Sequence, residues 1–247
     1  MKATRFEFRF RLATGVLIYV LGFTLPWLIH LVGGPRVTTT WIALSGLLAR
    51  TGAVTMQFAV VAVTWLMIAL AALGAALRVS GTAYIGTGIM TSGQMHAGSV
   101  VAAGPYRWVR NPLYLGSLVF ACAVAVLMAP IGAIVFLILL FVHYLRLILG
   151  EEEFLAAQQG DAYLAYKARV PRLIPSLVPR VPRSPVHPHW LHAILAEIYP
   201  VGMALCFAMV AWHYNADLLI RAIIICFGLS LVVRAFLVQK PAPEQTL

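Results

Sequence analysis

Residues 104–114 hold the densest group of side chains that can do chemistry. The segment is Gly-Pro-Tyr-Arg-Trp-Val-Arg-Asn-Pro-Leu-Tyr. Asn111 stands directly before Pro112, and a capping side chain before a proline at the first helical position predicts that a helix starts here. Its free N–H groups and positive dipole end would suit a carboxylate or a phosphate. The alternative is a capped membrane helix whose Tyr, Trp and Arg side chains only anchor it at the lipid interface.

A second polar cluster, Glu151-Glu152-Glu153, follows Arg146. The chain has 8 acidic residues, and three of them stand together here. Negative charge at the C-terminal end of a membrane helix is unfavourable because the helix dipole is negative there, so we expect a compensating partner. For Glu151 and Glu152 we expect a ligand role, whereas Glu153 is expected to face water.

Both clusters lie in a strongly apolar chain. Of its 247 residues, 62% are hydrophobic and 11% are charged, whereas a soluble domain has about 25% charged residues. Too little polar chain remains for an independent soluble catalytic domain. The net charge of +10 comes from short basic clusters between uncharged stretches, which makes nucleic acid a poor partner. We expect no metal site, because the His and Cys residues lack ligand spacing.

Long apolar stretches predict an all-α, polytopic membrane protein with about six transmembrane helices. A bilayer core of about 30 Å needs roughly 20 residues to cross it. The stretches are 12–32, 51–77, 111–145, 198–216 and 218–238. Ala129-Pro130 interrupts the third, which predicts two short helices joined by a tight hairpin. Residues 41–48 are expected to form an interfacial or re-entrant segment on the outer face.

The basic residues predict the orientation. If both termini are cytoplasmic, all Lys and Arg residues except Arg36, Arg50 and Arg221 lie on the cytoplasmic side, as the positive-inside rule requires. The polar segments 78–110 and 150–189 then flank the hairpin on one membrane face. In the second segment we expect helix to about Ala168 and extended, Pro-rich chain after it. Glu197 is expected to snorkel to the interface.

Together the two clusters resemble the isoprenylcysteine carboxyl methyltransferase family, within the wider group that includes phospholipid N-methyltransferases. The matching residues before the hairpin are Gly104, Tyr106, Arg110, Asn111, Pro112, Tyr114 and Gly116, and those after it are Glu151, Glu152, Leu155, Gly160, Tyr163, Tyr166 and Val170. The match covers about residues 98–175, and the two halves together are far more specific than either alone. Asn where the family more often has His resembles the bacterial members.

The resemblance implies S-adenosylmethionine as the methyl donor, bound at the cytoplasmic helix ends. The implied cofactor contacts are Gly98, Ser99, Val100, Val101, Tyr106, Asn111, Pro112, Leu113, Tyr114, Glu151 and Glu152. Such a carboxylate can accept hydrogen bonds from the ammonium and ribose of the donor, while Arg110 or the helix start can hold the donor's carboxylate.

The resemblance also implies an arginine that aims the acceptor. Eukaryotic members carry it four residues before the first glutamate, where this chain has Leu147. We expect Arg146 to replace it, so that Arg146 and Arg110 are the predicted catalytic residues. Gly98 and Gln159 also depart from the family pattern, and these changes weaken the inference about the acceptor more than the inference about the donor.

The expected protein is therefore a methyltransferase integral to a bacterial inner membrane, with its active site facing the cytoplasm. A lipid-like or prenylated acceptor would enter from the bilayer, and carboxyl O-methylation is the reaction that the resemblance implies. The alternatives are N-methylation of a lipid amine, an NADPH-dependent steroid-reductase-like enzyme, or a non-enzymatic membrane protein. We expect N-terminal helices over 1–97, a methyltransferase core over 98–180 and a C-terminal helix pair over 181–247. The sequence does not indicate an oligomeric state.

Overall fold

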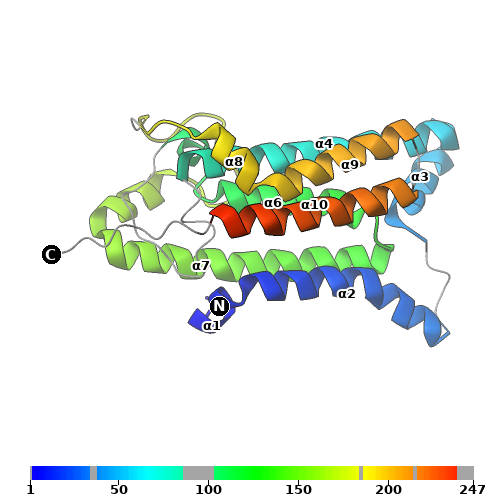
Figure 1. Ribbon diagram of the computed structural model, residues 1–247, viewed down its shortest axis with the longest axis horizontal. Helices are drawn as coiled ribbons and strands as arrows, with labels where there is room; N and C mark the ends of the chain where they lie inside the picture. Colours follow the sequence, from blue (N-terminus) through cyan, green and yellow to red (C-terminus); the bar gives the residue numbers. More distant parts are fainter. Residues whose placement is uncertain (1, 34–37, 86–102, 184–185, 214–215, 238–247) are drawn as a thin grey trace.

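The computed structural model describes residues 2–33, 38–85, 103–183, 186–213 and 216–237, and these residues form helices and connecting turns with no strand. The elements are α1 (Arg5–Arg9), α2 (Arg11–Leu31), α3 (Thr40–Arg50), α4 (Met56–Ile85), the 3-10 helix η1 (Gly104–Arg107), α6 (Pro112–Ala125), α7 (Pro130–Arg169), α8 (Trp190–Ala196), α9 (Ile198–His213) and α10 (Ala216–Leu237). The long helices lie side by side in one elongated bundle, with α1 and the Pro-rich segment at one end and α3 at the other (Figure 1).

Apolar helices long enough to cross a membrane account for much of the bundle. In the described residues, α2, α4 and α7 meet this condition, and α8 with the described part of α9 forms a further candidate that is bent by 74°. Helix α6 has only 14 residues, fewer than the roughly 20 of a full span. The all-helical architecture with several candidate membrane spans is thus confirmed for the described residues. Six spans and cytoplasmic termini remain predictions.

The predicted hairpin is formed by α6 and α7. Helix α6 ends at Ala125, and Pro130 occupies the first turn of α7. One arm is longer than predicted, because α7 continues for 40 residues to Arg169. Up to its break at Gly160 the helix is already about 45 Å long at about 1.5 Å per residue, longer than a bilayer core of about 30 Å. The second half of α7 therefore extends past the membrane and carries the three glutamates.

Helices α4 and α6 pack with their backbones in direct contact. A Cβ atom on Gly74 would lie 2.7 Å from the carbonyl oxygen of Gly116 and 2.7 Å from the amide nitrogen of Phe120. Small residues allow such close packing between membrane helices. The close approach brings Arg78 of α4 within hydrogen-bond distance of Ser117 on α6.

We expect Gly74→Ala to destabilise the bundle, because the new methyl group meets backbone atoms and the two helices must separate. Overpacking of this kind costs about 1–3 kcal/mol, which a lower thermal unfolding midpoint in detergent would report. Gly46→Ala in α3 is the matched control, since a Cβ there has nothing within 4 Å. Equal midpoints for the two variants would contradict the described packing.

The C-terminal helices are joined to α4 by a buried ion pair. Glu197 is 1% exposed. Its carboxylate accepts hydrogen bonds from Nε and Nη2 of Arg78 (2.7 and 2.9 Å) and from the Thr82 hydroxyl (2.8 Å). The expectation that Glu197 snorkels to the interface is therefore wrong, because Arg78 supplies the opposite charge inside the bundle.

Candidate functional site

The segment before the hairpin and the glutamates after it meet at one end of the bundle. The Tyr114 hydroxyl donates a hydrogen bond to Oε1 of Glu151 (2.8 Å). Nη2 of Arg110 lies 3.0 Å from Oε1 of Glu152. The Tyr166 hydroxyl donates to the carbonyl oxygen of Tyr106 (2.8 Å). The two polar segments therefore converge on one membrane-proximal region, as the sequence predicts.

Glu152 lies at the centre of a buried charge cluster. It is 2% exposed, and Oε1 accepts hydrogen bonds from Nε of Arg110 and Nε of Arg172 (both 3.1 Å) and from Nδ2 of Asn111 (3.4 Å). Oε2 accepts from Nη2 of Arg172 (2.9 Å), and Nζ of Lys167 lies 3.7 Å away. With both oxygens engaged by cations, Glu152 ties the loop before α6 to the end of α7. Its predicted contact with a cofactor remains a prediction.

Glu151 has a different environment from its neighbour. It is half-buried, and its described hydrogen bond comes from a neutral hydroxyl, that of Tyr114. The positive charge of Arg11 lies nearby. A carboxylate bonded by a neutral tyrosine is better suited than Glu152 to receive a cationic ligand.

Arg110 is held on every side by the chain around it. Its side chain is 8% exposed, and Nη1 donates to the carbonyl oxygens of Lys167 and Val170. Its backbone N–H donates to the carbonyl oxygen of Pro171 (2.8 Å). Through these bonds Arg110 links the two polar segments. Its catalytic role remains a prediction.

Asn111 occupies the N-cap position of α6, but its side chain makes no capping hydrogen bond. The predicted capping interaction is wrong because the side chain is held elsewhere: its Nδ2 donates to Glu152 and to the carbonyl oxygen of Arg172 (3.2 Å). The helix start itself is confirmed, with Pro112 in the first turn. Its first N–H groups are thus left without the Asn111 oxygen as an acceptor.

Tyr106 places a buried hydroxyl in the same region. The residue is 6% exposed, and within the described part of the chain its hydroxyl has no hydrogen-bond partner. Burial raises the pKa of this hydroxyl well above its ordinary value, with the nearby charge of Glu151 adding to the effect. Buried polar groups usually have a partner, so this hydroxyl fits a site that takes a ligand. The predicted contacts Gly98, Ser99, Val100 and Val101 lie outside the described residues.

A sharp break at Gly160 turns the last part of α7. Gly160 has φ 55° and ψ −135°, a conformation that is essentially restricted to glycine. The chain beyond it folds back over the end of the bundle (Figure 1). Tyr163, Tyr166 and Val170 then pack together, and Tyr166 reaches the backbone of Tyr106.

Comparison with known proteins finds a family match in this region. Residues 62–162 match the phospholipid methyltransferase family. The match starts within α4, includes the hairpin and ends just after Gly160, so the matched region contains Tyr106, Tyr114, Glu151 and Glu152. No curated protein and no solved structure matches the chain.

A Pro-rich strap, residues 170–183, completes the site from beyond the matched family region. The backbone N–H groups of Ser176 and Arg180 donate to the carbonyl oxygens of Trp108 (3.0 Å) and Arg107 (2.9 Å). Arg172 comes from this strap, and sequence reasoning did not single it out. The sequence indicated that three adjacent glutamates need a positive partner. It did not indicate which of several basic residues is that partner.

Arg146, the predicted replacement for the family arginine, contacts the N-terminal segment. Its Nη2 lies 2.8 and 2.9 Å from the two carboxylate oxygens of Glu7, and its carbonyl oxygen accepts from the N–H of Ala3 (3.0 Å). Lys2 pairs with Glu153 (2.6 Å), whose side chain is 57% exposed, as expected of a residue facing water. Residues 2–7 thus contact α7 on both sides of Glu151 in the sequence.

The contact between α1 and α7 should weaken in acid. The hydrogen bond from Arg146 lowers the pKa of Glu7 to about 2. A lowered pKa means that the contact stabilises the fold above the ordinary pKa and loses this effect as pH falls towards about 2. The thermal midpoint of the wild type should therefore exceed that of Glu7→Gln near neutral pH, and the difference should shrink below about pH 4. A difference that does not change with pH would contradict this role of the ion pair.

Proposed function

We propose that the protein is an integral membrane methyltransferase that uses S-adenosylmethionine to methylate a carboxyl group on a lipid-like or prenylated acceptor. The observation that carries the proposal is the half-buried Glu151 close enough to the unpartnered hydroxyl of Tyr106 to influence it electrostatically, within a stretch that matches a methyltransferase family. The glutamate end of the bundle is proposed to face the cytoplasm, where the basic residues predict it to be.

The described residues fit a cationic donor. Glu151 would accept hydrogen bonds from its ammonium or ribose hydroxyls, and Tyr106 would supply a buried hydroxyl and an aromatic face. Arg110 is committed to Glu152, so the start of α6 at Pro112 and Leu113 is the better place for the donor's carboxylate. When bound, S-adenosylmethionine supplies the methyl group to be transferred.

The protein's part in such a transfer is to bind, orient and exclude water. Attack by a carboxylate on a methyl group is an in-line displacement that removes no proton, so no general base is required. Holding the two reactants in line, away from water, then supplies the acceleration. Arg146 would aim an anionic acceptor, for which its contact with Glu7 would have to open.

N-methylation of a lipid amine is the second candidate. The observation that favours it is the family match itself, because the matched family is that of phospholipid methyltransferases. In that reaction the attacking amine is uncharged, so an arginine cannot orient it by charge. Activity that depends on Arg146 would therefore favour O-methylation over N-methylation.

Methyl transfer from labelled S-adenosylmethionine by the purified protein tests the proposal. We expect label in a prenylated cysteine and release of that label by mild base, as for a methyl ester. Base-stable label in phosphatidylethanolamine would favour N-methylation instead. Absence of donor binding together with tight binding of NADPH would overturn the methyltransferase proposal.

Arg146→Ala should lower turnover more than donor affinity. Misplacement of one reactant by about 1 Å can cost about a hundredfold in rate, so we expect a fall in kcat of that order with nearly unchanged donor affinity. Glu7→Gln is the control, since it removes the same ion pair and leaves the arginine in place. If Arg146→Ala turns over at the wild-type rate, Arg146 does not orient the acceptor.

A further inference from the structure

The strap carries exposed apolar side chains at the end of the bundle that holds the candidate site. Leu177 is 99% exposed, Ile174 82% and Val178 56%. Single exposed apolar residues are ordinary, but several close together on a short non-helical segment mark an interaction surface. The bilayer-facing sides of the long helices do not account for them, because the strap lies beyond the end of α7.

The exposure of these side chains follows from the way the strap is fastened. Main-chain hydrogen bonds join it to Arg107, Trp108 and Arg110, and Nε of Arg107 donates to the carbonyl oxygen of Val181 (3.0 Å). Prolines at 171, 175, 179 and 182 prevent a helix that would turn the apolar side chains inward. Ile174, Leu177 and Val178 are therefore presented outward by a backbone fixed at both ends.

The charge around the strap has a single sign. No acidic residue occurs between Asp161 and Glu197. Arg172 is engaged with Glu152, whereas Arg169, Arg180 and Arg183 are exposed. Apolar side chains among exposed arginines are the chemistry of segments that lie in the interface of an anionic leaflet.

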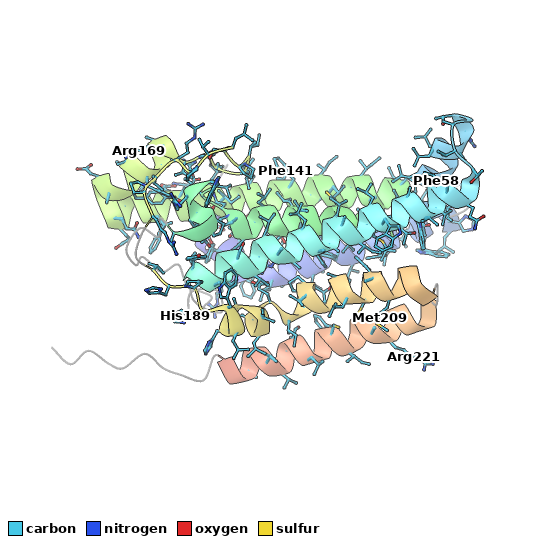
Figure 2. The ribbon with its side chains drawn as sticks, turned by 90° about the horizontal axis from the view of Figure 1, so that it is seen from above. Phe58, Phe141, Arg169, His189, Met209 and Arg221 are labelled. Atoms are coloured by element: carbon cyan, nitrogen blue, oxygen red, sulfur yellow. The ribbon has the colours of Figure 1, made fainter. Side chains whose placement is uncertain are left out.

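The position of the strap agrees with such an interface. Figure 2 shows Arg169 and His189 at one end of the elongated bundle and Arg221 and Phe58 at the other. The strap directly follows Arg169 in the chain, so it lies at this end of the bundle, which is the depth of the head groups when the long helices cross a bilayer. Trp190, which begins α8 directly after this segment, is 49% exposed, and tryptophan is enriched at this depth.

We propose that the strap docks on the adjacent anionic leaflet, with Ile174, Leu177 and Val178 inserted among the head groups and Arg180 and Arg183 bound to lipid phosphates. The partner is the bilayer surface itself. This inference does not rest on the methyltransferase proposal, because it concerns a surface whose chemistry is visible without any bound donor or acceptor.

Fluorescence of the full-length protein in lipid nanodiscs tests the proposal. Tryptophan is introduced as Leu177→Trp, and the emission of the wild type, with its 6 native Trp residues, is subtracted. Ile138→Trp, at a 58% exposed position in the middle of the apolar part of α7, reports insertion, and Gln158→Trp on the exposed later part of α7 reports the aqueous side. Brominated lipids are used with and without phosphatidylglycerol.

In discs with phosphatidylglycerol, we expect brominated lipid to quench the added emission of Leu177→Trp nearly as strongly as that of Ile138→Trp, and to leave Gln158→Trp unquenched. Adding Arg180→Glu and Arg183→Glu should remove most of this quenching. Leu177→Trp emission that stays as unquenched as that of Gln158→Trp would overturn the docking, and a partner other than a bilayer would then have to explain the surface. Quenching that is unaffected by both charge reversals would overturn the lipid-phosphate contacts.

Discussion

Replacing Glu151 with glutamine should abolish measurable binding of S-adenosylmethionine while the helices stay folded. The substitution keeps the shape of the side chain and its hydrogen bond from Tyr114, and it removes the charge that would face the donor's ammonium. Loss of one partner from a buried charge pair costs about 3–5 kcal/mol, which corresponds to about two to four orders of magnitude in affinity. Calorimetric titration with the donor and with its demethylated product measures the effect.

Tyr114→Phe is the matched control for this result. It leaves the carboxylate charged and removes a hydrogen bond that orients the carboxylate without contacting the donor, so donor affinity should fall much less than in Glu151→Gln. Wild-type affinity in Glu151→Gln, with unfolding midpoints unchanged, would exclude Glu151 as a donor contact. A wild-type protein that binds no donor would reject the proposed function itself.

Glu152→Ala should instead destabilise the folded protein, by about 3–5 kcal/mol. Arg110 is 8% exposed, and without the carboxylate its charge would remain buried beside Lys167 and Arg172. We expect a large drop in the thermal midpoint and loss of activity that follows loss of folded protein. Thermal unfolding in detergent, followed by circular dichroism, measures the drop.

The neighbouring Glu153 provides the comparison. Its side chain is 57% exposed and pairs with Lys2 at the surface, so Glu153→Ala should change stability by less than about 1 kcal/mol. Similar midpoints for Glu152→Ala and Glu153→Ala would show that the buried cluster does not hold the two polar segments together. The two adjacent variants therefore separate a structural glutamate from a solvated one.

Local sequence signals were enough to predict the elements that position the site. Apolar runs of about 20 residues indicate membrane helices whatever their partners, and Ala129-Pro130 divides one run into the α6–α7 hairpin that the structure contains. Because that hairpin returns the chain to the same face, the meeting of Tyr114 with Glu151 followed from connectivity. The end of α7 at Arg169 also lies within one residue of the expected position.

The partners of individual charges could not be predicted in this way. Arg172 bonds to Glu152, and Arg78 bonds to Glu197. Whether such residues meet depends on how the helices pack, and spacing in the sequence does not reveal that. Asn111 was mispredicted for the same reason. Its side chain bonds to Glu152, which is distant in the sequence, and does not cap the helix that it precedes. Gly160 was expected inside a continuous helix, and only its positive φ shows that α7 turns there.

The ion pair between Arg78 and Glu197 imposes an order on biosynthesis. The partners are 119 residues apart, so at about 5–20 residues per second the ribosome makes the arginine about 6 to 24 s before its carboxylate. Throughout this interval α4 carries a cation whose counter-ion does not yet exist. The matched family region can therefore be translated in full before the charge of Arg78 is neutralised. Glu197, between α8 and α9, then pairs with Arg78 and joins these later helices to α4.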